Sequence, residues 1–217
     1  METSWYPELE AEGTLLAVFR RLLCPDVPLE EMKSWPGRNV VLNRPDRSVN
    51  VTLGYTERRF LLQFWLRGAY VASGSTADLA AAAEAARDWA AGATTAEMTT
   101  AWPFTEFGAW ARACERGEGI EYKWRQLHAH RDEAPQLVPL SRFIERAAAE
   151  PRLRAWFPFT SHFTLGFRRT PGRAPAAGVW VTAVRDGGFE VQGPDRETVV
   201  VPDVETTVAR VLALLDG

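Results

Sequence analysis

Alternation of apolar and polar side chains after a proline is the feature that most constrains this chain. In residues 151–169, PRLRAWFPFTSHFTLGFRR, Pro158 fixes its own φ and biases the residue before it toward extended backbone. From Phe163 the pattern repeats every second residue, which predicts a strand with one apolar and one polar face. The apolar face would carry Phe163, Leu165 and Phe167, and the polar face His162, Thr164, Gly166 and Arg168. The prediction therefore places an imidazole and a guanidinium along one face, about 20 Å apart.

The first hundred residues predict a helix, strands and a second helix. Apolar residues at helical spacing over 9–23 predict a helix that Pro25 stops. Residues 25–39 are predicted to be an irregular connector, followed by a half-buried strand at 49–53 and a strand at 60–66 that is apolar enough to be covered on both sides. A third short strand lies around 70–73. Ser75 or Thr76 would then cap a helix over 79–91 that ends at Gly92.

The rest of the chain alternates between helical and extended patterns. A helix is expected to follow Trp102, and residues 120–127 alternate enough to predict a strand, which could instead continue into the charged residues at 128–136. A helix over 143–148 ends at Pro151. The remaining predictions are a loop at 170–178, strands at 179–184 and 189–192 joined by the hairpin pair Asp186-Gly187, a short strand or turn at 199–201, and a last helix from 204 to 215.

Together these patterns predict an α+β protein of antiparallel sheet and flanking helices. The order suggests two similar α-β-β-β-α halves, an N-terminal half at residues 1–100 and a C-terminal half at 139–217. Residues 101–138 would form a helical and loop connector. We expect the halves to pack as one compact body, with a groove between their sheets as the natural ligand site.

Composition favours an ordinary soluble, cytoplasmic protein. The chain has 217 residues and a formal charge of −3, which gives no reason to expect nucleic acid or an acidic membrane as a partner. Neither a signal peptide nor a long apolar run is apparent, so a reducing cytoplasm is expected, with Cys24 and Cys114 free and packed as small apolar groups. The nine tryptophans suggest that some indoles line a cleft or an interface.

Three segments resemble a known family. They are ASGSTADLAAAAEAARDWAAG, AWPFTEFGAWARACERGEGIEYKWRQL and PRLRAWFPFTSHFTLGFRR, which lie between residues 72 and 169. They resemble DUF6193, an uncharacterised actinobacterial family labelled "natural product biosynthesis protein". The resemblance implies a role in secondary metabolism, with a partner enzyme of the same pathway, and it implies no agreed catalytic residues, fold or substrate.

His162 is the first candidate for catalysis. It opens the polar strand face, and a neutral imidazole near pH 7 can act as a base or an acid. The alternative is an imidazole hydrogen-bonded to backbone at the start of a strand. Ser161 would point to the other side of the strand, which disfavours a Ser–His dyad.

Acidic and basic side chains supply the other polar candidates. Glu106 and Glu121 lie near aromatic residues and could act as general acids, or they could be surface charges. Arg152 and Arg168 could clamp a carboxylate or phosphate, or they could pair with surface acids.

Two functions are consistent with these candidates. In the first, the protein acts without a cofactor on a small metabolite or modified peptide in an aromatic-lined cleft whose walls are Trp102, Trp124 and Trp156. In the second, it is a non-catalytic binding module: a peptide carrier, a self-protection protein or a partner subunit. No metal is expected, because His128 and His130 lack a clear third ligand, and no glycine-rich nucleotide motif is present.

Overall fold

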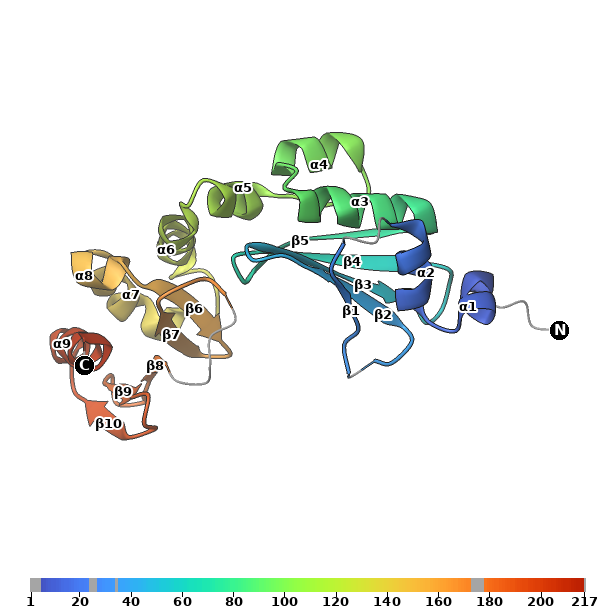
Figure 1. Cartoon of the computed structure of the whole chain (residues 1–217). Helices are drawn as coiled ribbons and strands as arrows, with labels where there is room; N and C mark the ends of the chain where they lie inside the picture. The colour runs from blue at the N-terminus through green and yellow to red at the C-terminus, as the bar shows by residue number, and fades with distance from the viewer. Residues whose placement is uncertain (1–4, 24–26, 34, 173–177, 217) are drawn as a thin grey trace. The chain divides into compact units, whose positions relative to one another are not determined.

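A computed structural model describes residues 5–23, 27–33, 35–172 and 178–216 (Figure 1). Contacts divide the chain into two units, Met1–Arg116 and Gly117–Gly217. Each unit has its own apolar core and, over the described residues, one five-stranded antiparallel sheet. The prediction of an α+β protein with antiparallel sheets and flanking helices is confirmed. Cys24, Pro25 and residues 173–177 of the expected loop lie outside the described residues.

The first unit is a meander of strands with helices before and after it. Each strand pairs with the next strand along the chain, in the order β1-β2-β3-β4-β5. The elements are α1 (Pro7–Glu12), α2 (Leu15–Leu22), β1 (Leu29–Glu30), β2 (Asn39–Asn43), β3 (Arg47–Leu53), β4 (Phe60–Leu66), β5 (Ala69–Thr76), α3 (Leu79–Ala91), α4 (Thr95–Ala101) and α5 (Ala109–Glu115).

Among the described residues of the first unit, helices cover one face of the first sheet. Along β4, Phe60, Leu62 and Phe64 are buried, and α2 and α3 pack on that side of the sheet. The alternate residues point the other way, and Leu61 is 40% exposed there. The prediction that this strand is covered on both sides was therefore wrong. The apolar residues of a strand do not show whether a helix packs on one face of the sheet or on both. We call the uncovered side the open face.

The helix after β5 begins and ends through local chemistry. Asp78, rather than Ser75 or Thr76, is the N-cap, and its carboxylate accepts hydrogen bonds from the backbone N–H groups of Ala80 and Ala81. Gly92 ends α3 with a φ of 107°, as predicted, because glycine adopts this left-handed conformation at little cost.

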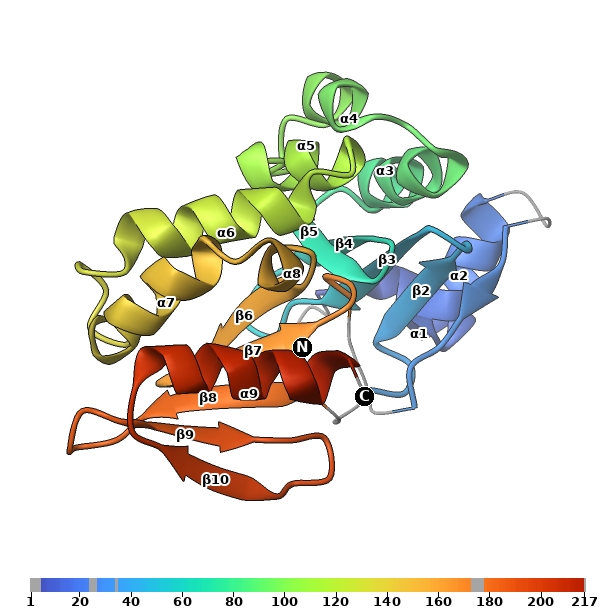
Figure 2. The same cartoon turned by 90° about the vertical axis from the view of Figure 1, so that its left-hand side faces the viewer.

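The second unit repeats the arrangement of helices around a meander. Its sheet has the order β10-β9-β8-β7-β6, and Figure 2 shows α9 lying along this sheet. The elements are α6 (Gly119–His130), the 3-10 turn η1 (Val138–Leu140), α7 (Ser141–Ala148), α8 (Pro151–Arg154), β6 (Phe157–Ser161), β7 (Thr164–Arg168), β8 (Val179–Ala183), β9 (Phe189–Gln192), β10 (Thr198–Val201) and α9 (Val204–Asp216).

The stretch that follows Pro158 is a hairpin rather than one strand. It folds as β6 and β7, joined by a turn at His162 and Phe163. Leu165 and Phe167 are buried on one side of β7 as predicted, whereas Phe163 is 60% exposed. The predicted alternation was therefore right for residues 164–168 and wrong for residues 162 and 163. Turn residues can continue the alternating pattern of apolar and polar side chains by chance, so the pattern does not show where the strand begins.

Residues 120–127 form helix α6, so the strand predicted there was wrong. Ile120, Trp124 and Leu127 follow helical spacing and pack into the second core. The charged residues between them mimic the alternation of a strand. The helix extends to His130, so the expected loop at 128–136 begins later than predicted.

Each half contains five strands among the described residues, rather than the three predicted. The sequence reading missed β1 within the presumed connector at 25–39 and β2, which begins at its last residue, and it counted the β6–β7 hairpin as one strand. The segment 101–138 is divided between the units: residues up to 116 belong to the first and those from 117 onward to the second.

Candidate functional site

His162 lies in the exposed turn between β6 and β7. Its φ of 54° is in the left-handed region, which non-glycine residues adopt mainly in turns. The imidazole Nδ1 lies 3.3 Å from Oγ of Ser161, so the expectation that these side chains point apart was wrong. Both side chains are exposed. His162 is not part of the lining of either pocket described below, and a proton-transfer group needs a positioned substrate to act.

Arg168 lies at the other end of the same hairpin and packs on two aromatic rings. Its guanidinium carbon is 4.9 Å from the ring centre of Phe157 and 4.5 Å from that of Phe159. It also donates a 2.8 Å hydrogen bond to the carbonyl of Pro171. Burial lowers the pKa of Arg168. The structure therefore does not bring this guanidinium to His162.

Ion pairs hold the other predicted polar residues of the second unit. Arg152 pairs with Asp216 at the end of α9. Glu121 on α6 pairs with Arg154, and its carboxylate is also 4.0 Å from Arg125. These contacts match the surface-pairing alternative more closely than a general acid.

The three tryptophans expected to wall a cleft are divided between the two units. Trp124 is buried in the second core and donates its indole N–H to the carbonyl of Trp156 over 3.0 Å. The half-buried ring of Trp156 carries Arg169 above it, at 4.0 Å. Trp102 belongs to the first unit, where its indole N–H donates to Asp88 over 3.1 Å.

Glu106 also belongs to the first unit. Its backbone N–H donates to the carbonyl of Ser73, and Thr105 forms a bridge with Gly74, so residues 104–106 cover the edge of β5. The side chain of Glu106 is exposed. Glu106 is therefore part of the segment that covers the edge strand β5. Covering an edge strand prevents its free backbone groups from pairing with another chain.

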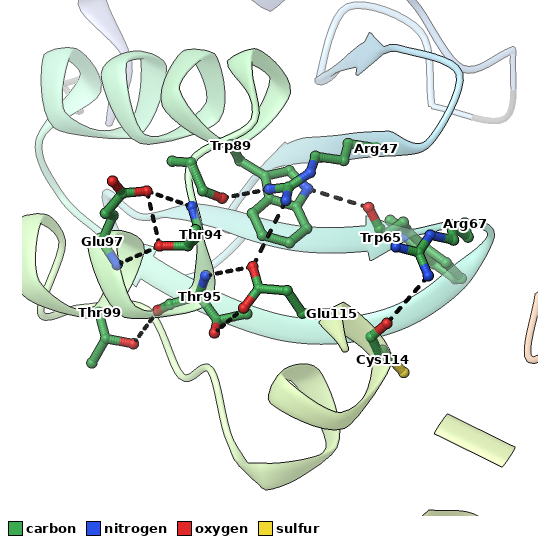
Figure 3. Close-up of polar contacts among 11 residues, drawn as sticks. Arg47, Trp65, Arg67, Trp89, Thr94, Thr95, Glu97, Thr99, Cys114 and Glu115 are labelled. Atoms are coloured by element: carbon green, nitrogen blue, oxygen red, sulfur yellow. Dashed lines mark hydrogen bonds and ion pairs between the residues drawn. The ribbon is translucent and has the colours of Figure 1, made fainter. Parts of the chain in front are cut away.

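A polar cluster closes one end of the first sheet (Figure 3). The Arg47 guanidinium lies 4.2 Å from the ring centre of Trp89 and 3.8 Å from the Glu115 carboxylate, and burial lowers its pKa. Glu115 accepts hydrogen bonds from the backbone N–H and the hydroxyl of Thr95. These contacts join β3 to α3, α4 and α5. The polar groups of the cluster already bind one another and the backbone, so we assign the cluster a structural role.

The neighbouring thiol of Cys114 is predicted to be unreactive in the native protein. Burial raises its pKa from 9.0 to about 11. At about pH 8 we expect iodoacetamide to label Cys114 only after denaturation, because the thiolate is the reactive form. Peptide mapping by mass spectrometry reads this cysteine separately from Cys24. Equal labelling of Cys114 in native and denatured protein would contradict the assignment.

The open face of the first sheet carries a concave site of about 330 Å³ that the sequence analysis did not predict. We call it the sheet cleft. Strands β2, β3 and β4 form its floor, and the segments around residues 32–35 and 55 form its walls. Its lining is Met32, Trp35, Asn39, Asn50, Thr52, Leu53, Tyr55, Leu61 and Gln63.

Buried hydrogen bonds hold one wall of the sheet cleft against the strands. The Asn39 side chain is 1% exposed; it accepts from the backbone N–H of Met32 and donates to the carbonyls of Met32 and Trp35. A buried amide of this kind is normally fully bonded, and here its bonds fix the loop. The rings of Trp35 and Tyr55 then meet, with centres 5.5 Å apart. Arg38 lies over Tyr55 at 4.9 Å and donates to the carbonyl of Gly54.

The chemistry of the sheet cleft is aromatic and uncharged. Tyr55 is 63% exposed and Trp35 is 43% exposed, so both rings are available to a ligand. None of the lining side chains is a carboxylate, an amine or a guanidinium. On the floor, Asn50 donates to Gln63 over 3.3 Å, while its Oδ1 atom is buried with no partner among the described residues. Such an acceptor costs about 1–3 kcal/mol until a donor reaches it.

Sequence reasoning missed the sheet cleft because its residues come from unremarkable positions. Asn50 and Thr52 were recognised only as the polar side of a half-buried strand, and residues 25–39 as a connector. A usable signal was present: an amide and a hydroxyl on β3 lie beside Gln63 within an otherwise apolar run, and Trp35 precedes them.

His128 and His130 lie in the last turn of α6, where residues two apart point in different directions, so the two imidazoles lie on different faces of the helix. Over the residues that the structure describes, no three His, Cys, Asp or Glu side chains are grouped as metal ligands would be. Within the same residues, none of the helices is both long and apolar enough for a bilayer crossing.

Comparison with known proteins identifies one family. Residues 118–215 match the family model DUF6193, a family of unknown function. The match confirms the resemblance for the second unit and continues beyond residue 169, whereas the similar segments before residue 118 lie outside it. No curated protein matches the chain. No solved structure matches it either.

Proposed function

We propose that this protein, whose residues 118–215 are a DUF6193 domain, is a non-catalytic binding protein that holds a small neutral ligand in the sheet cleft of its first unit. The ligand carries a flat apolar group and an N–H donor, as an aromatic metabolite or a short modified peptide does. The proposal rests chiefly on one observation: two exposed aromatic rings stand over an amide floor with an unpaired buried acceptor.

The size and lining of the sheet cleft support a small neutral ligand. Its volume of about 330 Å³ lies at the lower end of the range for ligand pockets. The lining holds no counter-charge, and the guanidinium beside its wall, Arg38, is occupied with the Tyr55 ring and the carbonyl of Gly54, so burying a charged group there is unfavourable. Flat apolar groups gain by stacking on Trp35 and Tyr55, whose rings lose few rotamers on binding.

The amide floor supports a ligand with an N–H donor. Asn50 and Gln63 already share one hydrogen bond, and it leaves Oδ1 of Asn50 unpaired. A ligand N–H that reaches this oxygen removes the cost of an unsatisfied buried acceptor, and a ligand without one does not. The floor therefore favours amide-containing compounds over hydrocarbons of similar shape.

Binding without turnover is favoured because none of the proton-transfer candidates lines the sheet cleft. His162 lies in an exposed turn, Glu121 is ion-paired, and Glu106 belongs to the edge cover of β5. Tyr55 is the one ionisable side chain in the lining of the sheet cleft. General acid–base catalysis requires such groups within hydrogen-bonding reach of the reacting atoms.

A fluorescence titration tests the binding site. N-phenylnaphthylamine is neutral, aromatic and carries one N–H donor, and it fluoresces more strongly in apolar sites. We expect saturable binding by the whole protein and about tenfold weaker binding by Tyr55→Ala, because a stacking surface is lost. Tyr70→Ala is the matched control: Tyr70 is an exposed tyrosine on the first sheet, outside the lining of the sheet cleft, and its replacement should leave the affinity unchanged.

Two further comparisons test the chemistry of the site. Anilinonaphthalene sulfonate has the same ring system with an added negative charge, and it should bind more weakly than the neutral probe. Asn50→Leu removes the unpaired acceptor and should weaken binding of N-phenylnaphthylamine. Equal affinities for both probes, or unchanged binding in Tyr55→Ala, would refute the sheet cleft as the ligand site.

Mass spectrometry separates binding from catalysis. The wild-type protein and Tyr55→Ala are incubated with a metabolite extract of the source cells, and bound compounds are released and weighed. We expect compounds enriched on the wild type alone, with masses that also occur in the untreated extract. A wild-type-dependent product mass would favour the enzyme of the first hypothesis instead. The proposal keeps a role in natural-product biosynthesis and a cytoplasmic location, both of which come from the sequence.

A further inference from the structure

The second unit contains a separate groove of about 460 Å³ whose lining is charged. Helices α6, α7 and α8 contact one another around it, and Figure 2 shows the three helices grouped together. Its lining is Trp124, Arg125, His128, Ala129, Glu145, Ala148, Ala149 and Arg154. We call it the helix groove. None of these residues lines the sheet cleft.

Guanidiniums outnumber the carboxylate in this lining. Arg125 and Arg154 contribute two guanidiniums, against the single carboxylate of Glu145, and His128 adds an imidazole. Ala148 and Ala149 add only methyl groups, which leave room beside the guanidiniums. A planar guanidinium can donate two parallel hydrogen bonds to a carboxylate or phosphate.

Arg154 is held in place before any ligand arrives. One guanidinium nitrogen donates to the carbonyl of Ala148 over 3.3 Å, and the other pairs with Glu121. The Glu121 carboxylate also lies 4.0 Å from Arg125, one turn away on α6. A single acid therefore contacts both arginines of the helix groove, although it is not part of the lining itself.

From this arrangement we propose that the helix groove binds a small oxyanion, a carboxylate or a phosphate group, between Arg125 and Arg154, and that Glu121 occupies these arginines when the ligand is absent. The ligand anion then takes the place of the Glu121 carboxylate on at least one guanidinium. No covalent step is involved. This site is independent of the sheet cleft, so either proposal can fail without the other.

Titration by ¹H–¹⁵N NMR of the whole protein tests the site, with inorganic phosphate and succinate as separate probes at constant ionic strength. We expect saturable shifts confined to residues 121–130 and 145–154 with at least one probe. The probe that binds more tightly identifies the headgroup as phosphate or carboxylate. Shifts spread evenly over surface arginines with both probes would overturn the proposal.

Two substitutions are expected to act in opposite directions. Arg154→Gln should weaken binding at least about tenfold, because a charge-assisted pair of hydrogen bonds is lost. Glu121→Gln should tighten it by up to about fivefold, the equivalent of one exposed ion pair, because the competing carboxylate is removed. Weaker or unchanged binding in Glu121→Gln would show that this acid does not compete with a ligand, and would overturn the proposal.

Arg152→Gln is the matched control for charge alone. Arg152 lies on the same short helix, carries the same charge and pairs with Asp216, but it is not part of the helix groove. Its replacement should leave the affinity unchanged. If Arg152→Gln weakened binding as much as Arg154→Gln, a general surface-charge effect would replace the proposed site. A folded amide spectrum for each variant shows that the comparison is made on intact protein.

Discussion

Replacing Trp89 with alanine is expected to lower the free energy of unfolding by about 3–5 kcal/mol, the cost of removing a large aromatic side chain from a core. Trp89 is fully buried, and its ring contacts those of Phe64 and Phe107, with centres 5.8 and 5.0 Å away. Its indole N–H donates to the carbonyls of Ser48 and Trp65 at 3.2 Å each. The substitution removes apolar burial and leaves two strand carbonyls without this donor.

Urea denaturation followed by circular dichroism measures this loss. Hydrogen exchange should place it in the first unit, with lower protection in strands β3 and β4. Trp89→Phe keeps a ring but removes the N–H, so it should cost less than alanine. Trp65→Ala is a second control, because that side chain is only partly buried and its carbonyl remains. A loss below about 1 kcal/mol in Trp89→Ala would contradict the packing described here.

The second large effect is expected for Trp124→Ala in the second unit, again about 3–5 kcal/mol. Trp124 is 1% exposed, its ring centre lies 6.0 Å from that of Phe167, and its N–H bonds the carbonyl of Trp156. The sequence suggested this residue as a wall of a ligand cleft. The structure makes it a core residue that fixes α6 against the β6 end of the sheet, and it also places the residue in the lining of the helix groove.

The same denaturation and exchange measurements apply, with protection lost in α6, β6 and β7. Trp156→Ala is the control, since its backbone carbonyl still accepts the bond and its own ring is only half-buried. N-phenylnaphthylamine should bind Trp124→Ala as tightly as the wild type under conditions where the variant is folded. A stable Trp124→Ala that had lost this binding would restore the residue to a ligand site.

Local patterns predicted the elements whose signals are contained in a few neighbouring residues. Gly92 ends α3, Asp186-Gly187 joins β8 to β9, and the last helix runs from Val204 to Asp216. In these cases a backbone preference or a helical period acts over less than about twenty residues, so the sequence alone carries it. The α+β class followed from the same signals.

The candidate site could not be obtained in this way, because it depends on contacts between distant residues. The buried Asn39 amide holds the loop around Trp35, and the Tyr6 hydroxyl lies 3.0 Å from each of the carbonyls of residues 54, 57 and 59, near the cleft wall. The composition of residues 25–39 predicts a connector. It does not predict that this connector folds over the open face of a sheet.

The sequence by itself determined which side chains on each strand point together and where several helices end, since these properties follow from backbone geometry repeated every two or 3.6 residues. Only the tertiary structure decided which sheet face is covered, that His162 lies in a turn while Arg168 packs on phenylalanines, and that Trp35 and Tyr55 meet over Asn50. The physical reason is that burial is a property of the whole fold: a side chain becomes part of a core or of a site only when another segment packs against it.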